Sequence, residues 1–138
     1  MREYSCAILW RDGRILLGKR AVHRKAYPAC WDVIGGLVEK GEAVDAALIR
    51  ELGEEIGIVP TSYELLCSLE DEGKQARGEA VYHMHLVREW TGGEPALVND
   101  EHSALAWFKI EDACSLRDLA SAQYIDLFCN VRAAANSS

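Results

Sequence analysis

The feature that most constrains the fold is a segment, residues 43–56, in which apolar side chains recur at helical spacing. The repeating residues are Val44, Leu48, Leu52 and Ile56. This period predicts an amphipathic helix with one apolar stripe. Gly57 follows directly and suits a left-handed helix cap, and Pro60 lies shortly beyond it. We therefore predict a helix over residues 43–56 that packs on a hydrophobic core.

The same helix carries charges that cost stability. Glu51, Glu54 and Glu55 are spaced i, i+3 and i+4, so they share one face. Like charges at these spacings cost roughly 0.2–0.5 kcal/mol per pair, and the helix dipole penalises anions in the last turns by about 0.3–1 kcal/mol each. Gly53 costs around 1 kcal/mol relative to alanine. Arg50 alone does not neutralise three carboxylates, so the face suits Mg²⁺ or Mn²⁺, although the spacing taken alone also fits a solvated acidic surface.

The residues before the helix extend this segment into a longer motif. Gly36 is followed by five residues and Glu42, then by seven residues and the segment 50–58, Arg-Glu-Leu-Gly-Glu-Glu-Ile-Gly-Ile. This resembles the complete Nudix box, G-x5-E-x7-R-E-U-x-E-E-x-G-U, where U is a bulky aliphatic residue, and every specified position is matched. On this basis the chain is identified as a member of the Nudix hydrolase family, in its MutT-like branch.

The resemblance implies a metal site and a catalytic set. The implied metal ligands for Mg²⁺ (or Mn²⁺) are the Gly35 carbonyl and the carboxylates of Glu51, Glu54, Glu55 and Glu101. The catalytic set is Glu51, Glu54 and Glu101, with Glu51 as the first choice for general base and Glu101 as the second. Replacement of Glu54 by Gln should lower turnover by orders of magnitude while the fold stays intact.

The resemblance also implies roles for residues around the carboxylates. Arg20 is the candidate for a phosphate contact because its guanidinium can bind bidentately. Trp31 or Tyr82 could stack on a base, or could belong to the core. The residues with structural roles in the motif are Gly36, Glu42, Arg50 and Gly57. Glu42 and Arg50 are expected to brace the loop and helix through a salt bridge.

The rest of the chain alternates between strand and helix patterns. The predicted strands are residues 3–10, 14–20, 31–34, 63–71, 79–90 and 104–110, and a second helix is predicted over 122–134. Asp12-Gly13 is a strong hairpin turn, and Gly35-Gly36 is expected to end the third strand. This order predicts an α/β fold, which the resemblance makes a Nudix-type α/β/α sandwich around a mixed β-sheet. We expect one domain over residues 1–134 and a loose tail at 135–138.

Charge and composition exclude several classes of protein. The net charge is −7 without a Lys/Arg cluster, which argues against binding of polymeric nucleic acid. The apolar runs are too short to span a membrane, and the N-terminus lacks a secretory signal pattern. The five cysteines are an odd number without C-x-x-C spacing, which argues against a disulfide framework and predicts reduced, mostly buried thiols in a cytoplasmic protein. Either a monomer or a homodimer fits.

The function that the resemblance favours is hydrolysis of a (d)NTP, canonical or oxidised, to a nucleoside monophosphate and pyrophosphate. One alternative is hydrolysis of another nucleoside diphosphate derivative, such as ADP-ribose, a nucleotide sugar or a dinucleoside polyphosphate. Another is a catalytically inactive domain that binds a nucleotide as a sensor. An asparagine that reads oxidised guanine in MutT aligns near Ser121 or Ala122, which weakens a preference for that base. His83 and His85 face one side of a predicted strand and could be a metal pair or structural residues.

Overall fold

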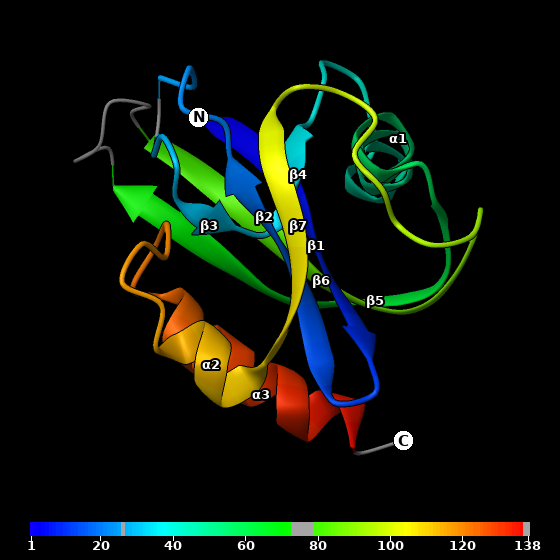
Figure 1. The fold of residues 1–138 in the computed structure, drawn as a ribbon. Coiled ribbons are helices and arrows are strands. Elements are labelled where there is room, and N and C mark those ends of the chain that lie inside the picture. Colours follow the sequence, from blue (N-terminus) through cyan, green and yellow to red (C-terminus); the bar gives the residue numbers. More distant parts are fainter. Residues whose placement is uncertain (26, 73–78, 137–138) are drawn as a thin grey trace.

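The computed structural model describes residues 1–25, 27–72 and 79–136. Within this part of the chain, seven strands form one mixed sheet with helices on both of its faces (Figure 1). The strands are β1 (Arg2–Arg11), β2 (Arg14–Arg20), β3 (Trp31–Asp32), β4 (Ile34–Leu37), β5 (Val59–Glu72), β6 (Glu79–Thr91) and β7 (His102–Lys109). The helices are α1 (Val44–Ile56), α2 (Ile110–Cys114) and α3 (Tyr124–Ala135). Across the described residues, every helix is too short or too polar to cross a membrane.

Strand β1 lies at the centre of the sheet, whose main order is β3-β2-β1-β6-β5. It pairs in parallel with β6, from Arg2 opposite Ala80 to Leu9 opposite Val87. It also pairs antiparallel with β4 along its first half and with β2 beside the hairpin turn. Strand β7 lies on the other side of β2. A central strand with both parallel and antiparallel partners makes the sheet mixed, as predicted.

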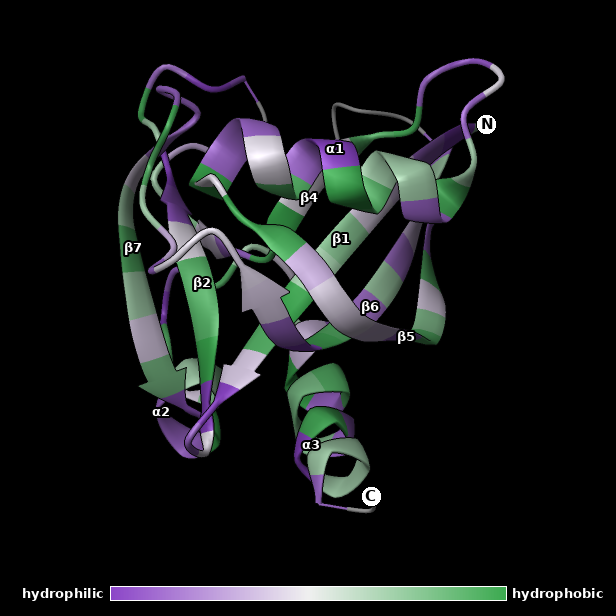
Figure 2. Ribbon diagram, turned by 90° about the vertical axis from the view of Figure 1, so that its right-hand side faces the viewer, coloured by the Kyte–Doolittle hydropathy of each residue, from purple (hydrophilic) through white to green (hydrophobic). Residues whose placement is uncertain are grey.

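Alternation along β1 creates two cores, one on each face of the sheet. Ile8 points toward α2 and α3, where Phe128 is fully buried. Ala7 and Leu9 point toward α1, whose apolar stripe, including Leu48, packs against them. Figure 2 shows α1 and α3 on opposite sides of the strands. The α/β/α arrangement therefore follows from a central strand that is apolar on both sides.

Two turn predictions are confirmed. Asp12 and Gly13 have φ values of 52° and 77°, so both central residues of the β1–β2 hairpin adopt the positive φ that a type I′ turn requires. Gly57 ends α1 with φ 70°, and its N–H donates to the Leu52 carbonyl. Glycine pays no steric cost in this left-handed conformation.

The structure corrects several predicted boundaries. The third strand does not end at Gly35-Gly36, because β4 continues through both glycines and pairs with β1. A side chain at Gly35 would collide with the β1 backbone, so glycine here permits close strand approach and does not break the strand. Strand β5 begins at Val59, earlier than predicted, and α2 was not predicted at all. Helix α3 begins at Tyr124 and reaches Ala135, into the predicted tail; residues 137–138 lie outside the described residues.

The cysteines are all free thiols, in agreement with the prediction that no disulfide framework exists. Their expected burial is wrong, because only Cys6 is buried. Cys30, Cys67 and Cys114 are partly exposed, and Cys129 is exposed. Sequence spacing does not reveal this difference, since exposure depends on which side of each strand, helix or loop packs against the rest of the protein.

Candidate active site

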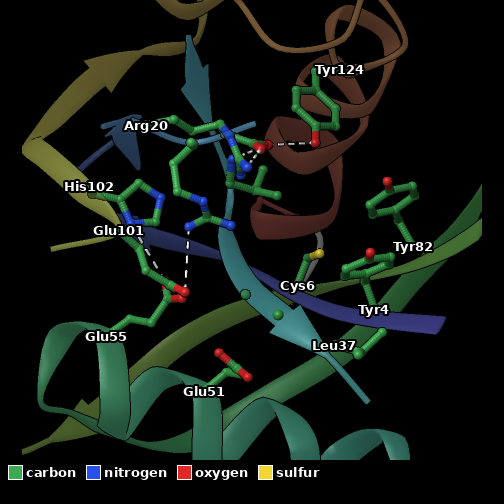
Figure 3. A pocket seen from close by; sticks show the side chains of 15 residues that line it. Tyr4, Cys6, Arg20, Leu37, Glu51, Glu55, Tyr82, Glu101, His102 and Tyr124 are labelled. Atoms are coloured by element: carbon green, nitrogen blue, oxygen red, sulfur yellow. Dashed lines mark hydrogen bonds and ion pairs between the residues drawn. The ribbon is translucent and has the colours of Figure 1, made fainter. Parts of the chain in front are cut away.

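A cavity of about 320 Å³ lies where α1 faces β4 and the loops that flank β2 and β7 (Figure 3). Its lining combines carboxylates, arginines and aromatic rings from distant parts of the chain. The lining residues are Tyr4, Cys6, Arg20, Arg24, Asp32, Val33, Gly35, Gly36, Leu37, Glu51, Glu55, Tyr82, Glu101, His102 and Tyr124. Among the site residues predicted from sequence, Arg20, Gly35, Gly36, Glu51, Glu55, Tyr82 and Glu101 are brought together here.

Glu51 enters the cavity from α1 and packs against Gly36 of β4. Glu51 is only 9% exposed to solvent. A side chain on Gly36 would occupy the position of the Glu51 carboxylate, so the glycine provides the room for it. Burial raises the pKa of Glu51, whereas the hydrogen bond from Arg50 opposes that shift. The carboxylate is thus partly desolvated and held at a fixed place.

Glu55 and Glu101 share a hydrogen bond on the inner side of the cavity. Burial, followed by this contact, raises the pKa of Glu55 to about 10. The same hydrogen bond lowers the pKa of Glu101. Glu55 therefore holds the proton and donates to Glu101, because the buried Glu55 carboxyl is disfavoured as an anion next to a second, charged carboxylate.

His102 borders the same pair of carboxylates. Its Nδ1 lies 3.6 Å from Glu55 Oε2, which is too long for a good hydrogen bond. Burial lowers the pKa of His102, so the imidazole is neutral and the contact is not a charged pair. Glu55 Oε2 and both His102 ring nitrogens are buried without a hydrogen-bond partner in the described structure. Buried polar atoms of this kind are costly unless a ligand or an ion completes them.

Arg24 brings a positive charge to this end of the cavity. Its Nη1 lies 3.5 Å from Glu101 Oε1, and its side chain is 28% exposed. The segment that follows β2 carries Arg24, while Glu101 immediately precedes β7. The structure places Arg24 in the cavity lining, where its guanidinium could also reach a phosphate group.

Arg50 braces the loop before α1, as the motif implied. It donates to Glu42 through Nε at 2.8 Å and Nη2 at 2.9 Å, and Nη2 also donates to the Leu37 carbonyl at 3.0 Å. Nη1 donates to Glu51 Oε1 at 2.8 Å. The bidentate contact and the Glu39 backbone N–H lower the pKa of Glu42 to about 2. One guanidinium thus ties β4, the loop and α1 together.

Glu54 lies apart from the other carboxylates of the motif. Its side chain is 56% exposed, and its Oε2 accepts a hydrogen bond from Arg50 Nη1 at 3.2 Å. Glu54 is not part of the cavity lining. Its assignment as a metal ligand and catalytic residue stays a prediction.

A buried polar network forms the opposite wall. Arg20 Nη1 lies 3.4 Å from Asp32 Oδ2, with both side chains 8% exposed. Tyr124 donates its hydroxyl to Asp32 Oδ1 at 2.6 Å, and the Val33 N–H donates to the same oxygen at 2.8 Å. Burial and Asp32 raise the pKa of Tyr124, so its hydroxyl keeps the proton. This network fixes Arg20 at the cavity wall.

The two aromatic candidates occupy different places. Tyr82 lines the cavity and stacks on Tyr4 with ring centroids 4.8 Å apart (Figure 3). Trp31 packs edge-on against Phe108 at 5.0 Å and lies beneath Lys19, outside the lining of the cavity. Stacking on a base therefore stays a prediction for both residues, with Tyr82 the better placed.

Sequence reasoning missed Asp32, Tyr124, His102 and Tyr4 as lining residues. Asp32 and His102 adjoin Trp31 and Glu101, which the resemblance did single out, so the signal was close by. Tyr124 lies on a face of α3 that is indistinguishable from its core stripe in the sequence. The histidines His83 and His85 lie elsewhere, since His83 contacts Ser68 and Glu3, and His85 contacts the Cys6 carbonyl.

Glu51, Glu55 and Glu101 suit a divalent cation chemically, since their oxygens are the hard donors that Mg²⁺ and Mn²⁺ prefer. The buried Oε2 of Glu55 lacks a partner, and the proton between Glu55 and Glu101 occupies a position that a cation could take over. In the described ranges, no three carboxylate, histidine or cysteine side chains already enclose a metal position. The shared proton and the outward orientation of Glu54 account for this.

The comparison with protein families decides the identity. The family model described as NUDIX domain matches residues 1–129. The chain belongs to the Nudix family. It is 31% identical over 121 residues to the nucleoside triphosphatase NudI of Salmonella newport, covering 80% of this chain and 84% of that relative.

Solved Nudix structures agree with the fold. The MutT Nudix hydrolase from Burkholderia pseudomallei superposes with a TM-score of 0.81 at 36% identity, covering 91% of this chain and 95% of that chain. The E. coli ORF135 protein gives a TM-score of 0.78 at 34% identity, covering 100% and 95%. The predicted α/β fold and the assignment as a Nudix hydrolase are thereby confirmed.

Proposed function

We propose that this Nudix hydrolase is a Mg²⁺-dependent nucleoside triphosphate pyrophosphohydrolase, which releases a nucleoside monophosphate and pyrophosphate. The observation that carries the proposal is the meeting of Glu51, Glu55 and Glu101 in one cavity whose other walls supply arginines and aromatic rings. A relative at 31% identity is named a nucleoside triphosphatase, which supports a triphosphate as substrate.

The carboxylates would hold the cation, with Glu51, Glu55 and Glu101 as lining ligands, the Gly35 carbonyl beside them and Glu54 from the rim. When bound, such a cation polarises phosphate oxygens and increases the acidity of a water molecule. Its binding would require that Glu55 release the proton that burial and Glu101 favour, so cation binding would be coupled to proton release.

The protein's own groups then position the reaction. Glu51 accepts a proton from the attacking water, and the hydrogen bond from Arg50 keeps its carboxylate oriented. The water oxygen forms a new bond to phosphorus as the anhydride P–O bond breaks, and the electron pair leaves with pyrophosphate. Arg20 and Arg24 face the cavity and are the cations available to bind phosphate oxygens.

The nucleoside end is proposed to lie against Tyr82 and the hydrogen-bonded pair of Asp32 and Tyr124. Tyr82 and Tyr4 form an aromatic surface next to that pair (Figure 3). A base is flat and apolar on its faces but polar at its edges, so it matches a surface of this composition.

A release assay tests the proposal. Canonical and oxidised (d)NTPs, ADP-ribose, nucleotide sugars and dinucleoside polyphosphates are incubated with Mg²⁺, Mn²⁺ or EDTA, and pyrophosphate and phosphate are measured separately. We expect EDTA-sensitive pyrophosphate release that is concentrated in the triphosphates. Hydrolysis confined to ADP-ribose or nucleotide sugars would reject the triphosphate assignment. Nucleotide binding without turnover would indicate a sensor.

Substitution of the carboxylates tests the metal site. We expect Glu55→Gln and Glu54→Gln to lower kcat/KM by at least about 100-fold, because each removes a charged oxygen ligand. Both variants should fold, since glutamine can still donate to Glu101 at position 55 and like-charge repulsion falls at position 54. Glu70→Gln, on the exposed surface of β5, is the matched control and should keep full activity. Wild-type activity of Glu54→Gln would remove Glu54 from the site and leave the other ligands untouched.

A further inference from the structure

Helices α2 and α3 lie side by side (Figure 1). Each carries a cysteine at their contact, Cys114 on α2 and Cys129 on α3. The two helices contact each other in antiparallel register. Cys114 on α2 reaches Ile125 and Cys129 on α3, and Glu111, earlier on α2, reaches Arg132, later on α3. The ion pair between Arg132 and Glu111 is 2.8 Å long and lies beside the thiols. These two contacts therefore fix the register of the two helices.

The Cys114 thiol points directly at α3. Its Sγ lies 3.8 Å from the Ile125 carbonyl oxygen. Cys129 follows Ile125 by four residues, so its side chain projects from the same face of α3 one turn later. The two thiols are therefore neighbours across the contact between the two helices, and Cys129 is among the groups that raise the pKa of the Cys114 thiol. A disulfide needs two cysteines on facing elements whose side chains project toward each other, and this pair meets that requirement.

Exposure gives the two thiols different roles. Cys129 is exposed, so dissolved oxidants can reach it, whereas Cys114 is partly buried. Burial and the neighbouring Cys129 raise the pKa of the Cys114 thiol, which makes it the less reactive partner toward an oxidant. An accessible thiol next to a shielded one is the arrangement of an attacking and a resolving cysteine.

We propose that Cys114 and Cys129 form an intramolecular disulfide when the protein meets a hydroperoxide. The Cys129 thiolate attacks one peroxide oxygen and becomes a sulfenic acid as the O–O bond breaks and, for hydrogen peroxide, water leaves. The Cys114 sulfur then attacks the Cys129 sulfur, the S–O bond breaks, and a second water leaves. Two thiols lose two electrons and two protons, and the peroxide is reduced by the same number.

The bond would close a loop that contributes to the cavity wall. Tyr124 lies between the two cysteines in sequence, and its hydroxyl donates to Asp32 at 2.6 Å. A crosslink across this loop restricts the unfolded chain and the start of α3. For a loop of this size, we expect the melting temperature to rise by roughly 5–10 °C.

The experiment compares reduced and peroxide-treated protein. After oxidation, free thiols are alkylated, the protein is digested, and non-reduced peptides are identified by mass spectrometry. We expect one peptide pair joined through Cys114 and Cys129, formed at a rate independent of protein concentration, with the rise in melting temperature reversed by a reductant. Cys67→Ala removes a thiol on β5 and serves as the matched control, which should retain both effects.

Single variants separate the two roles. In Cys114→Ser, we expect Cys129 to stop at the sulfenic acid or higher oxides, and in Cys129→Ser we expect slow oxidation of Cys114. Both variants should match the wild-type melting temperature in reductant, which shows that they fold. A disulfide that joins two chains, or alkylated Cys114 beside overoxidised Cys129 in the wild type, would overturn the proposal. The result is independent of nucleotide hydrolysis.

Discussion

Gly36 has no side chain, and this sets the geometry of the candidate active site. The Glu51 carboxylate occupies the space that a methyl group on Gly36 would fill. The sequence motif requires glycine at this position, and the contact gives the physical reason. Close approach of backbone and carboxylate is a function that only glycine provides.

Replacement of Gly36 by alanine is expected to disable the enzyme without unfolding it. The new methyl group displaces the Glu51 carboxylate, and a displacement of this kind costs about 100-fold in rate. Steady-state kinetics on the substrate found by the release assay, together with circular dichroism, would measure both effects. An unchanged kcat/KM would show that the position of Glu51 is not critical.

Helix α1 combines a stable frame with an unfavourable charge pattern. Gly53 lies in its interior on the exposed side, and a methyl group there would meet only the Ile58 carbonyl oxygen, at 4.0 Å. Glycine at an open helical site is the costly choice without a local benefit. The free-energy cost of Gly53 therefore arises in the backbone of α1 and is separate from the cost of the clustered carboxylates.

Replacement of Gly53 by alanine should stabilise the protein by about 0.5–1 kcal/mol, because alanine loses less backbone entropy in a helix. Urea denaturation would report the change in the free energy of unfolding. Activity should stay within about twofold of wild type, since a surface change of this kind leaves the ligands in place. A loss of stability would mean that α1 is strained at this residue. Gly53→Ala and Gly36→Ala together form a matched pair of glycine substitutions.

The loop before α1 depends on the ion pair between Glu42 and Arg50, which makes its stability sensitive to acid. The pKa of Glu42 is about 2 in the folded protein, against an ordinary value of 4.5. A carboxylate with a lowered folded pKa stabilises the protein above its unfolded pKa, and this contribution disappears as the pH falls toward the folded pKa. Glu42→Gln lacks this titration.

We therefore expect Glu42→Gln to be less stable than wild type at neutral pH. The difference should shrink as the pH falls from about 4.5 to about 2, because the wild-type pair is then lost as well. Urea denaturation of both proteins across this range provides the measurement. A gap that stays constant with pH would show that Glu42 acts through packing and not through its charge.

Local patterns predicted the elements whose causes are local. The α1 helix, its Gly57 cap and the Asp12-Gly13 hairpin depend on neighbours in the chain, and all three are confirmed. Helix α2 was missed because it is only five residues long and follows β7 without a break. The end of the third strand was misjudged because glycine usually breaks a strand, whereas here β1 holds it.

The candidate site likewise contains residues that a local motif predicts and contacts that no local motif predicts. A motif on one helix and its preceding loop identified Glu51 and Glu55, and the resemblance identified Glu101. The contacts of Asp32 with Tyr124 and of Arg24 with Glu101 join segments far apart in sequence, and no local pattern encodes them. The outward orientation of Glu54 depends on where Arg50 finds its partners.

At the scale of the whole molecule, the two cores enclose polar groups that resist protonation. His85 is 4% exposed on β6, and its Nδ1 donates to the Cys6 carbonyl at 3.0 Å. Burial lowers the pKa of His85 below its ordinary value of 6.5. The unfolded chain therefore binds a proton at a higher pH than the folded one, so stability falls as the pH drops below about 6.5.

The stability of the wild type relative to His85→Asn should accordingly fall between pH 7 and pH 5. The comparison of the two proteins isolates His85, because Glu55, whose raised pKa contributes with the opposite sign in this interval, is present in both. His23→Asn removes a histidine whose side chain is 58% exposed and should keep the wild-type slope. Equal slopes in wild type and His85→Asn would show that burial of His85 is not linked to protonation.

The parallel pairing of β1 with β6 has a consequence for biosynthesis. Strand β1 can pair with β2 and β4 early, but it stays without its parallel neighbour β6 until the residues around Ala80 to Val87 have emerged from the ribosome. Helix α1 is complete well before that, but Glu101 is translated later still. Contacts between such distant segments slow folding, because a long loop must close first. The carboxylates of the candidate site are therefore brought together late, and a partly translated chain carries the acidic helix α1 before Glu101 is available to join it.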